Sequence, residues 1–172
     1  MHTRRYTLFA VALAGLACLL LAAASTSQAL TAKQKVGKSL FFDANLSAPA
    51  GLACAGCHAR NVGWTGPDAS VNLTGAVYPG AFPGRAGNRK PPAAAYAGYS
   101  PRLHYVNSTT GWVGGMFWDG RATGYRLGDP LTEQAQGPFL NPLEQNNADA
   151  AAVVAKVKAS SYAPLFLSLI HI

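Results

Sequence analysis

The 172-residue sequence predicts a mainly α fold with long loops. Residues 32–41 and 148–160 place apolar side chains at helical spacing. Between them, residues 60–115 are rich in Gly, Pro, Asn and Tyr, and no long stretch holds a helical period. No alternation of apolar and polar residues is long enough to predict a sheet. Helices are therefore expected early and late in the folded part, with an irregular segment between them.

Residues 1–29 have the pattern of a secretory signal peptide. Two arginines precede a small and apolar run over residues 8–24, and residues 27–29 form a small-x-small cleavage site. The run is short for a membrane span, and no charged stop follows it. We therefore expect export, cleavage after Ala29, and a periplasmic protein with no membrane anchor.

The charge of the exported chain argues against nucleic acid as a partner. Without Arg4 and Arg5, 12 basic residues face 7 acidic ones, so the net charge is 12 − 7 = +5. The basic residues are scattered, whereas nucleic-acid binders gather them in a patch or run. A mildly positive surface suits docking to an acidic redox partner, and it is equally typical of an ordinary solvated surface.

The first predicted helix covers residues 32–41. Thr31 and Gln34 have the spacing of a capping box at its start, and Val36 and Leu40 form an apolar pair four residues apart. This helix leads the chain toward a turn that contains two cysteines.

Cys54, Cys57 and His58 form the most specific motif in the chain, Cys-Ala-Gly-Cys-His. In c-type haem attachment, thiols at this spacing form thioethers with the porphyrin vinyl groups, and the histidine ligates the iron. A zinc site would need a second pair of ligands, and a thioredoxin-like redox pair would need a βαβ pattern. Neither is visible. The motif therefore predicts covalent haem c in a cytochrome c-like haem domain.

The irregular segment carries many aromatic residues. A long stretch without secondary structure is unusual in a compact domain unless something organises it, and the flat apolar surface of a haem would do so. We therefore expect burial against the haem for six side chains: Trp64, Tyr78, Phe82, Tyr96, Tyr99 and Trp112.

The second predicted helix covers residues 148–160. Asn147 is expected to cap it, and Tyr162 and Pro164 are expected to end it. Residues 167–172 do not follow this pattern and resemble the translation of a sequencing-library adapter. We therefore expect a haem domain over residues 30–166, a non-native tail after it, and a natural gene that continues.

Three further stretches carry a family resemblance. They are Gly-Lys-Ser-Leu-Phe-Phe-Asp at 37–43, Phe-Trp-Asp-Gly-Arg-Ala at 117–122, and the run from Glu133 to Glu144. With the haem motif, they resemble the bacterial di-haem cytochrome c peroxidase superfamily, which includes the methylamine-utilisation di-haem enzymes. The resemblance covers about residues 35–166, the N-terminal haem domain alone. It implies a second haem domain with its own attachment motif, which this sequence lacks.

The resemblance assigns catalytic roles to three residues. It makes Glu144 the distal acid/base, places Gln134 beside the distal face, and makes Trp118 an electron relay between the two haems. Peroxide cleavage needs an open iron position and a base that moves a proton between the oxygens. A carboxylate in an apolar pocket can have its pKa raised for that task, and an amide holds oxygen without titrating. Without the resemblance, surface or core positions are the ordinary interpretation of all three.

The sequence departs from the family in several places. The loop over residues 60–90 contains no histidine, where well-studied members place a distal one. The sixth iron position is then open, which we favour, or is taken by His104 or Met116. Residues 125–130 are an insertion, and Gln145 stands where methionine is common.

The expected function is reduction of hydrogen peroxide to water, with electrons from a small cytochrome c or copper protein. Two alternatives stay open: a mono-haem electron-transfer cytochrome, and a di-haem oxidase that modifies a protein substrate. The resemblance also leaves open a homodimer and a calcium ion between the domains, for which Asn88 is a candidate ligand.

Overall fold

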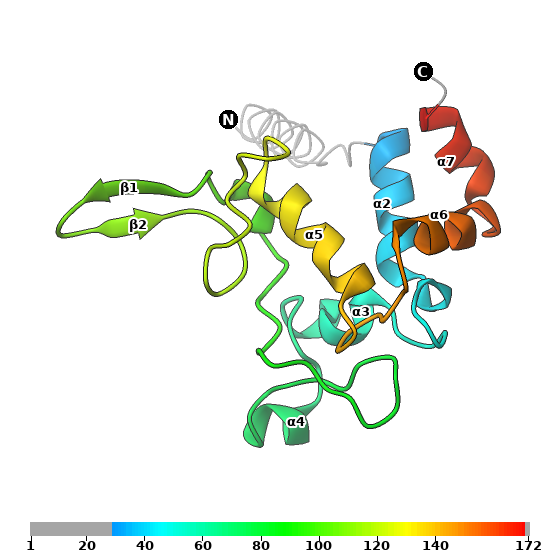
Figure 1. Ribbon diagram of the computed structural model, residues 1–172, viewed down its shortest axis with the longest axis horizontal. Helices are drawn as coiled ribbons and strands as arrows, with labels where there is room; N and C mark the ends of the chain where they lie inside the picture. Colours follow the sequence, from blue (N-terminus) through cyan, green and yellow to red (C-terminus); the bar gives the residue numbers. More distant parts are fainter. Residues whose placement is uncertain (1–28, 171–172) are drawn as a thin grey trace, which may run out of the picture. The chain divides into compact units, whose positions relative to one another are not determined.

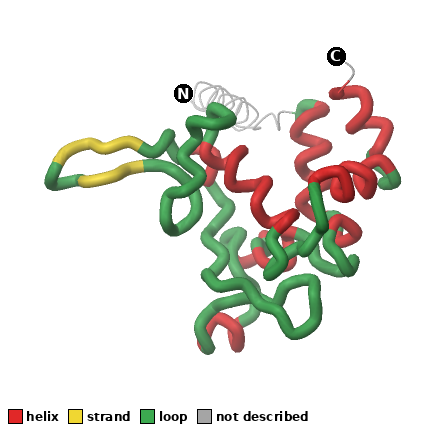
Figure 2. Tube along the Cα trace, in the orientation of Figure 1, coloured by secondary structure: helices red, strands yellow, loops and turns green. Residues whose placement is uncertain are grey.

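Short helices joined by long loops dominate the computed structural model, which describes residues 29–170 (Figures 1 and 2). Apart from Ala29, the predicted signal peptide lies outside these residues and stays a prediction. The helices and a single small sheet among the described residues agree with the predicted mainly α fold.

Helix α2, Ala32–Phe42, matches the first predicted helix and is one residue longer. It lies beside α7, Ala163–Ile170, and contacts α3, Cys54–Cys57 (Figure 1). A 3-10 turn, Ala44–Leu46, follows α2, and the side chain of Asp43 caps it by accepting the Asn45 N–H at 2.8 Å. The early helix therefore carries the chain directly to the cysteine turn.

The second predicted helix is shorter than expected, because α6 covers Ala150–Lys158. The prediction that Asn147 caps it is wrong: Asp149 does so, accepting the Ala152 N–H at 2.7 Å. A carboxylate two residues nearer the helix takes the cap, because Asn147 is buried and bonded elsewhere.

Asn147 joins segments that lie far apart in the sequence. Its Nδ2 donates to the carbonyls of Leu46, at 2.8 Å, and Phe139, at 2.9 Å. Its Oδ1 accepts from Lys156 Nζ at 2.7 Å, and the same ammonium donates to the Ser47 carbonyl at 2.6 Å. Leu46 is fully buried, so this network fixes the centre of the helical part.

Helix α7 begins at Ala163, so Pro164 lies in its first turn, where a proline costs no hydrogen bond. Helix α6 ends at Lys158, before Tyr162 and Pro164 as expected, whereas α7 was not predicted. By length and composition, no single described helix would cross a membrane, whereas α6 and α7 pass that test together as a pair bent by 119°. The predicted non-native tail stays a prediction.

Helix α5, Pro130–Leu140, was not predicted, because Gly137 and Pro138 interrupt its pattern. Asp129 caps it by accepting the Thr132 N–H at 2.7 Å, and Pro130 occupies its first position. This helix holds much of the run from Glu133 to Glu144 that carried the family resemblance.

The structure contains a two-stranded antiparallel sheet that the sequence did not predict. Strands β1, His104–Asn107, and β2, Gly111–Val113, pair with Tyr105 opposite Trp112. All four residues of β1 are exposed, so no buried face imposes an alternating pattern that the sequence would reveal. The hairpin projects away from the helices (Figure 1).

The aromatic residues of the irregular segment divide into two groups. Tyr78 is buried by protein contacts, and its hydroxyl accepts the Asp68 N–H at 2.8 Å. Tyr96 and Tyr99 are each 85% exposed and Trp112 is 68% exposed within the described chain. Their expected burial against a haem therefore stays a prediction.

Candidate active site

The cysteine turn has the local geometry that haem attachment needs. Helix α3 is a single turn, so Cys54 and Cys57 lie on the same face. Both are free thiols and both are half-buried. The backbone N–H of His58 donates to the Cys54 carbonyl at 2.9 Å and closes the turn, which brings the imidazole directly after the two thiols.

The ring of His58 is oriented through one of its nitrogens. Nδ1 lies 3.2 Å from the carbonyl oxygen of Trp64. Assigning the proton to Nδ1 makes this a hydrogen bond and leaves the lone pair of Nε2 for a metal. Two backbone bonds of 2.9 Å hold the loop around this contact, from Ala59 N–H to Thr65 and from Trp64 N–H to Ala59.

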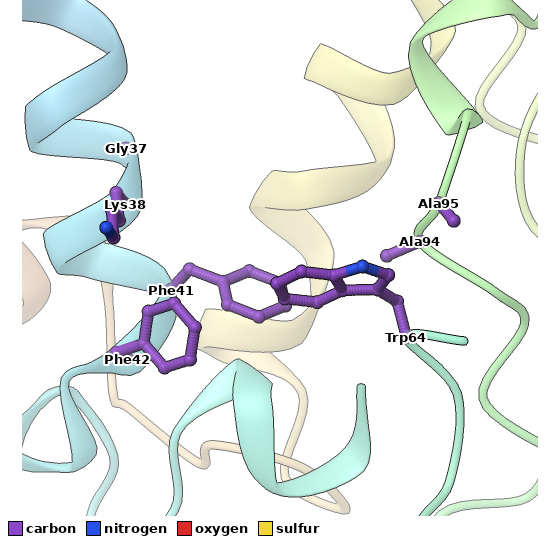
Figure 3. Close-up of a pocket in the computed structure, with 7 residues that line it drawn as sticks. All are labelled: Gly37, Lys38, Phe41, Phe42, Trp64, Ala94 and Ala95. Atoms are coloured by element: carbon purple, nitrogen blue, oxygen red, sulfur yellow. The ribbon is translucent and has the colours of Figure 1, made fainter. Parts of the chain in front are cut away.

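Aromatic side chains lie beside His58 and form an apolar wall. The ring of Phe41 lies 5.7 Å from that of Trp64 and 6.5 Å from that of His58. Figure 3 shows Phe41 and Trp64 at a pocket of about 360 Å³ between α2 and the loop that carries Ala94. Its lining comprises Gly37, Lys38, Phe41, Phe42, Trp64, Ala94 and Ala95. The family stretch at 37–43 therefore supplies part of an apolar surface at the haem motif.

Glu144 is held in the turn that follows α5. Asn141 Nδ2 donates to its Oε1 at 2.7 Å, and Asn141 Oδ1 accepts the Leu143 N–H at 3.0 Å. Burial raises the pKa of Glu144, while the Asn141 hydrogen bond and the charges of His58 and Arg121 oppose that rise. The carboxyl group thus combines burial with a positioned donor.

The electrostatics place Glu144 close to the attachment motif. The pKa of Cys57 is raised to about 11, first by burial and then by the negative charge of Glu144. Burial also raises the pKa of Cys54. The charge of Glu144 therefore acts at the attachment motif, and the catalytic role of Glu144 stays a prediction.

Gln134 and Trp118, the other two predicted catalytic residues, have fewer contacts that fix their side chains. Gln134 lies half-buried in the first half of α5. Trp118 is 65% exposed, and its Nε1–H donates to the Lys90 carbonyl at 2.9 Å. Among the described residues, no hydrogen bond joins either side chain to Glu144 or His58. Their catalytic roles therefore stay predictions.

The two candidate sixth ligands are held by local contacts. His104 is exposed on β1, with Nδ1 2.8 Å from the Arg102 carbonyl oxygen. Met116 is half-buried, and its backbone pairs with Ala122 through N–H to carbonyl bonds of 2.9 and 3.3 Å. An open sixth position stays the favoured prediction.

Gln145 is a site residue whose role sequence reasoning missed. It is 3% exposed, and its Nε2 lies 3.9 Å from Cys54 Sγ. Its Oε1 is the one buried side-chain polar atom in residues 29–170 that has no hydrogen-bond partner. Gln145 thus packs its buried amide against an attachment cysteine through Nε2. With the paired thiols, the oriented histidine and the apolar wall, these residues fit a haem.

Comparisons with known proteins identify the family of this chain. A sequence model of the family described as di-haem cytochrome c peroxidase matches residues 31–170. The chain is 37% identical over 150 residues to the methylamine utilization protein MauG of Paracoccus denitrificans, covering 85% of this chain and 36% of that protein. It is 31% identical over 131 residues to the cytochrome c peroxidase Ccp of Escherichia coli, covering 73% of this chain and 21% of Ccp.

A solved structure gives the same result. The diheme peroxidase BthA of Burkholderia thailandensis is 35% identical, with a TM-score of 0.64 over 78% of this chain and 30% of BthA. This chain therefore spans 36% or less of the length of each of these three proteins. Because the family model spans nearly the whole described chain, the resemblance predicted from the motifs is confirmed. The chain belongs to the di-haem cytochrome c peroxidase family.

Proposed function

We propose that this chain is the N-terminal haem domain of a periplasmic enzyme that reduces hydrogen peroxide to water. A small cytochrome c or copper protein would supply two electrons through a second haem domain, and two protons complete the reaction. The observation that carries the proposal is Glu144, a half-buried carboxyl group whose pKa is raised by burial and whose charge raises the pKa of Cys57. A general acid/base at an attached haem needs these properties.

Cys54 and Cys57 would hold the haem, and His58 would ligate its iron through Nε2. When bound, haem c supplies the iron at which the peroxide oxygen–oxygen bond is cleaved. Glu144 would take the proton from the near oxygen at Oε2, because Oε1 already accepts from Asn141. It would then return that proton to the far oxygen, which leaves as water.

Gln134 and Trp118 would play supporting parts. The amide of Gln134 would donate a hydrogen bond to the bound oxygen without titrating. Trp118 would relay electrons from the second haem, and its indole is held in place by the Lys90 carbonyl. Trp118→Leu should therefore spare the first reaction with peroxide and slow the delivery of electrons.

The test of this proposal is Glu144→Gln in the haem-loaded full-length protein. Proton transfer by a positioned side chain contributes ~10²–10⁴-fold, so steady-state peroxide turnover should fall by about that factor. Glutamine keeps the shape of the side chain and can still accept from Asn141. Asp149→Asn is the matched control, because it removes one carboxylate at the start of α6 and keeps a capping side chain.

Turnover in the control should match that of the wild type. Wild-type turnover in Glu144→Gln, with haem still attached, would show that Glu144 is not the acid/base, and the site assignment would fall with it. A wild-type protein that does not turn over peroxide would instead favour an electron-transfer cytochrome.

A protein-modifying oxidase is the second candidate function. It is favoured by the 37% identity to MauG and by the lack of a histidine in the loop over residues 60–90. Two assays with peroxide distinguish the peroxidase from the oxidase. In one, the protein is given a reduced small cytochrome; in the other, it is given proteins from the same periplasm. Rapid oxidation of the cytochrome supports the peroxidase, whereas a peroxide-dependent mass change in one protein substrate supports the oxidase.

A further inference from the structure

Glu133 is a buried carboxylate that the proposed chemistry does not use. It lies in the first turn of α5, and its two oxygens face the backbone of the loop before the helix. Oε2 accepts the Gly124 N–H at 2.9 Å, and Oε1 accepts the N–H groups of Arg126, at 2.6 Å, and Leu127, at 2.9 Å. One side chain thus binds three backbone donors of a single short loop.

These contacts favour the ionised form of Glu133. The Gly124 N–H lowers the pKa of the carboxyl group most, burial opposes it, and the Leu127 and Arg126 N–H groups and the Arg126 charge lower it further. Hydrogen bonds to an ionised acceptor are about twice as strong as neutral ones. The charge of Glu133 is therefore stabilised mainly by backbone dipoles rather than by an ion pair.

The loop held in this way, Gly124 to Leu127, begins two residues after Ala122, the last residue of the Phe-Trp-Asp-Gly-Arg-Ala motif. Gly124 has a φ of +85°, and a Cβ there would lie 2.8 Å from Pro130. Only glycine fits so close to the start of α5 without strain. Glu133 therefore closes a short connection that joins the tryptophan motif to the helix.

A second contact joins the same two segments one turn further along. A Cβ at Gly137 would lie 3.1 Å from the ring of Phe117, so that ring rests against α5. Phe117 itself has a φ of +63°, a backbone conformation that costs free energy in a non-glycine residue. Gln134 lies between the two contacts: it follows Glu133 and shares a helix face with Gly137, three residues on.

We infer that Glu133 is a positioning residue, which holds the Gly124–Leu127 loop against α5 and so fixes the direction of the Gln134 amide. The inference rests on the proposed function, because it assumes that Gln134 faces the iron. Glu133 would act only through the hydrogen bonds that its ionised carboxylate accepts from three backbone amides, and no group is transferred.

The test uses the haem-loaded full chain and two independent readouts. The first is trypsin cleavage after Arg126, because the scissile bond contains the Leu127 N–H that Glu133 binds. Glu133→Gln keeps the shape but places a donor against the loop donors. Hydrogen bonds to charged groups contribute about 1.5–3 kcal/mol, so cleavage there should rise about tenfold or more. Cleavage after Arg85, outside this loop, serves as the internal reference.

The second readout is the affinity of ferric haem for fluoride, followed by the visible spectrum. A bound fluoride accepts a hydrogen bond from a distal amide, so Gln134→Ala should weaken its binding about fivefold. Glu133→Gln should weaken it by a similar factor although Gln134 is intact. The matched control is Asp129→Asn, which removes a carboxylate at the same helix end and keeps a capping group; it should change neither readout.

The outcomes separate the two ideas. Faster cleavage together with weaker fluoride binding in Glu133→Gln supports the inference. Unchanged fluoride affinity in Glu133→Gln, with a loss in Gln134→Ala, overturns it and leaves Glu133 a structural residue. Unchanged affinity in both variants shows instead that Gln134 does not face the iron, and then the assignment of Gln134 fails and the inference with it.

Discussion

The two ends of α5 place a carboxyl group in opposite environments. At the start of the helix, three backbone N–H groups surround Glu133 and lower its pKa. Just beyond the end of the helix, Glu144 has one donor, Asn141, and burial raises its pKa. The number of donors, rather than burial alone, decides which of these carboxyl groups holds its charge firmly and which can exchange a proton.

This difference matches the two kinds of role. A carboxylate that keeps its charge over a wide pH range is suited to fixing a loop. A carboxyl group whose ionised and neutral forms are closer in free energy is suited to moving a proton at near-neutral pH. The predictions below change either the donor of Glu144 or the contacts that hold α5.

Among the changes to the surroundings of Glu144 and α5, the largest effect is expected from Asn141→Asp. The new side chain can still accept the Leu143 N–H, but it replaces the donor to Glu144 with a like charge. The pKa of Glu144 should rise further, so the fall in rate with decreasing pH should begin at a higher pH than in the wild type. On that acid limb, peroxide turnover should be about tenfold lower or more, since hydrogen bonds to charged groups contribute about 1.5–3 kcal/mol.

Asn61→Asp, which adds the same charge at an exposed position, is the control. Equal turnover in the two variants would show that Asn141 does not tune Glu144.

A smaller effect on stability is expected from Asn147→Ala. Asn147 Nδ2 binds the Phe139 carbonyl near the end of α5 and the Leu46 carbonyl in the core. Leaving such buried groups without partners costs about 1–3 kcal/mol each. Urea unfolding of the haem-loaded chain should therefore show a lower midpoint with an unchanged slope. Asn61→Ala, at an exposed position, should stay within about 0.5 kcal/mol of the wild type.

The smallest effect is expected from Gln134→Ala. This change removes one neutral hydrogen bond, worth about 1 kcal/mol, and no proton path. The first reaction with peroxide should slow about fivefold, measured by rapid mixing. A loss as large as that of Glu144→Gln would show that the two residues act as one unit.

Local signals in the sequence predicted a large part of the fold and site. The spacing of Val36 and Leu40 predicts helix α2, and a motif of five consecutive residues predicts the attachment turn. The family motifs led to Glu144, whose charge raises the pKa of Cys57, while its catalytic role stays a prediction. These features depend on residues close together in the chain, so they can be recognised from the sequence without knowledge of the fold.

The missed features depend on distant or backbone contacts. Asn147 looks like a helix cap, but it binds Leu46, which lies 101 positions away. The role of Glu133 depends on three N–H groups that every residue except proline carries, so composition gives no hint of it. The one available signal was Asp129 followed by Pro130, which is typical of the start of a helix.

The most direct test of the central claim is the pH dependence of the first reaction with peroxide, by rapid mixing of the haem-loaded full-length protein. The base form of Glu144 takes the proton, and burial raises its pKa. The wild-type rate should therefore fall as pH drops through a value above the ordinary pKa of glutamate, about 4.3. Glu144→Gln should react ~10²–10⁴-fold more slowly and lack this acid limb. A variant with the wild-type rate and the same acid limb would contradict the account.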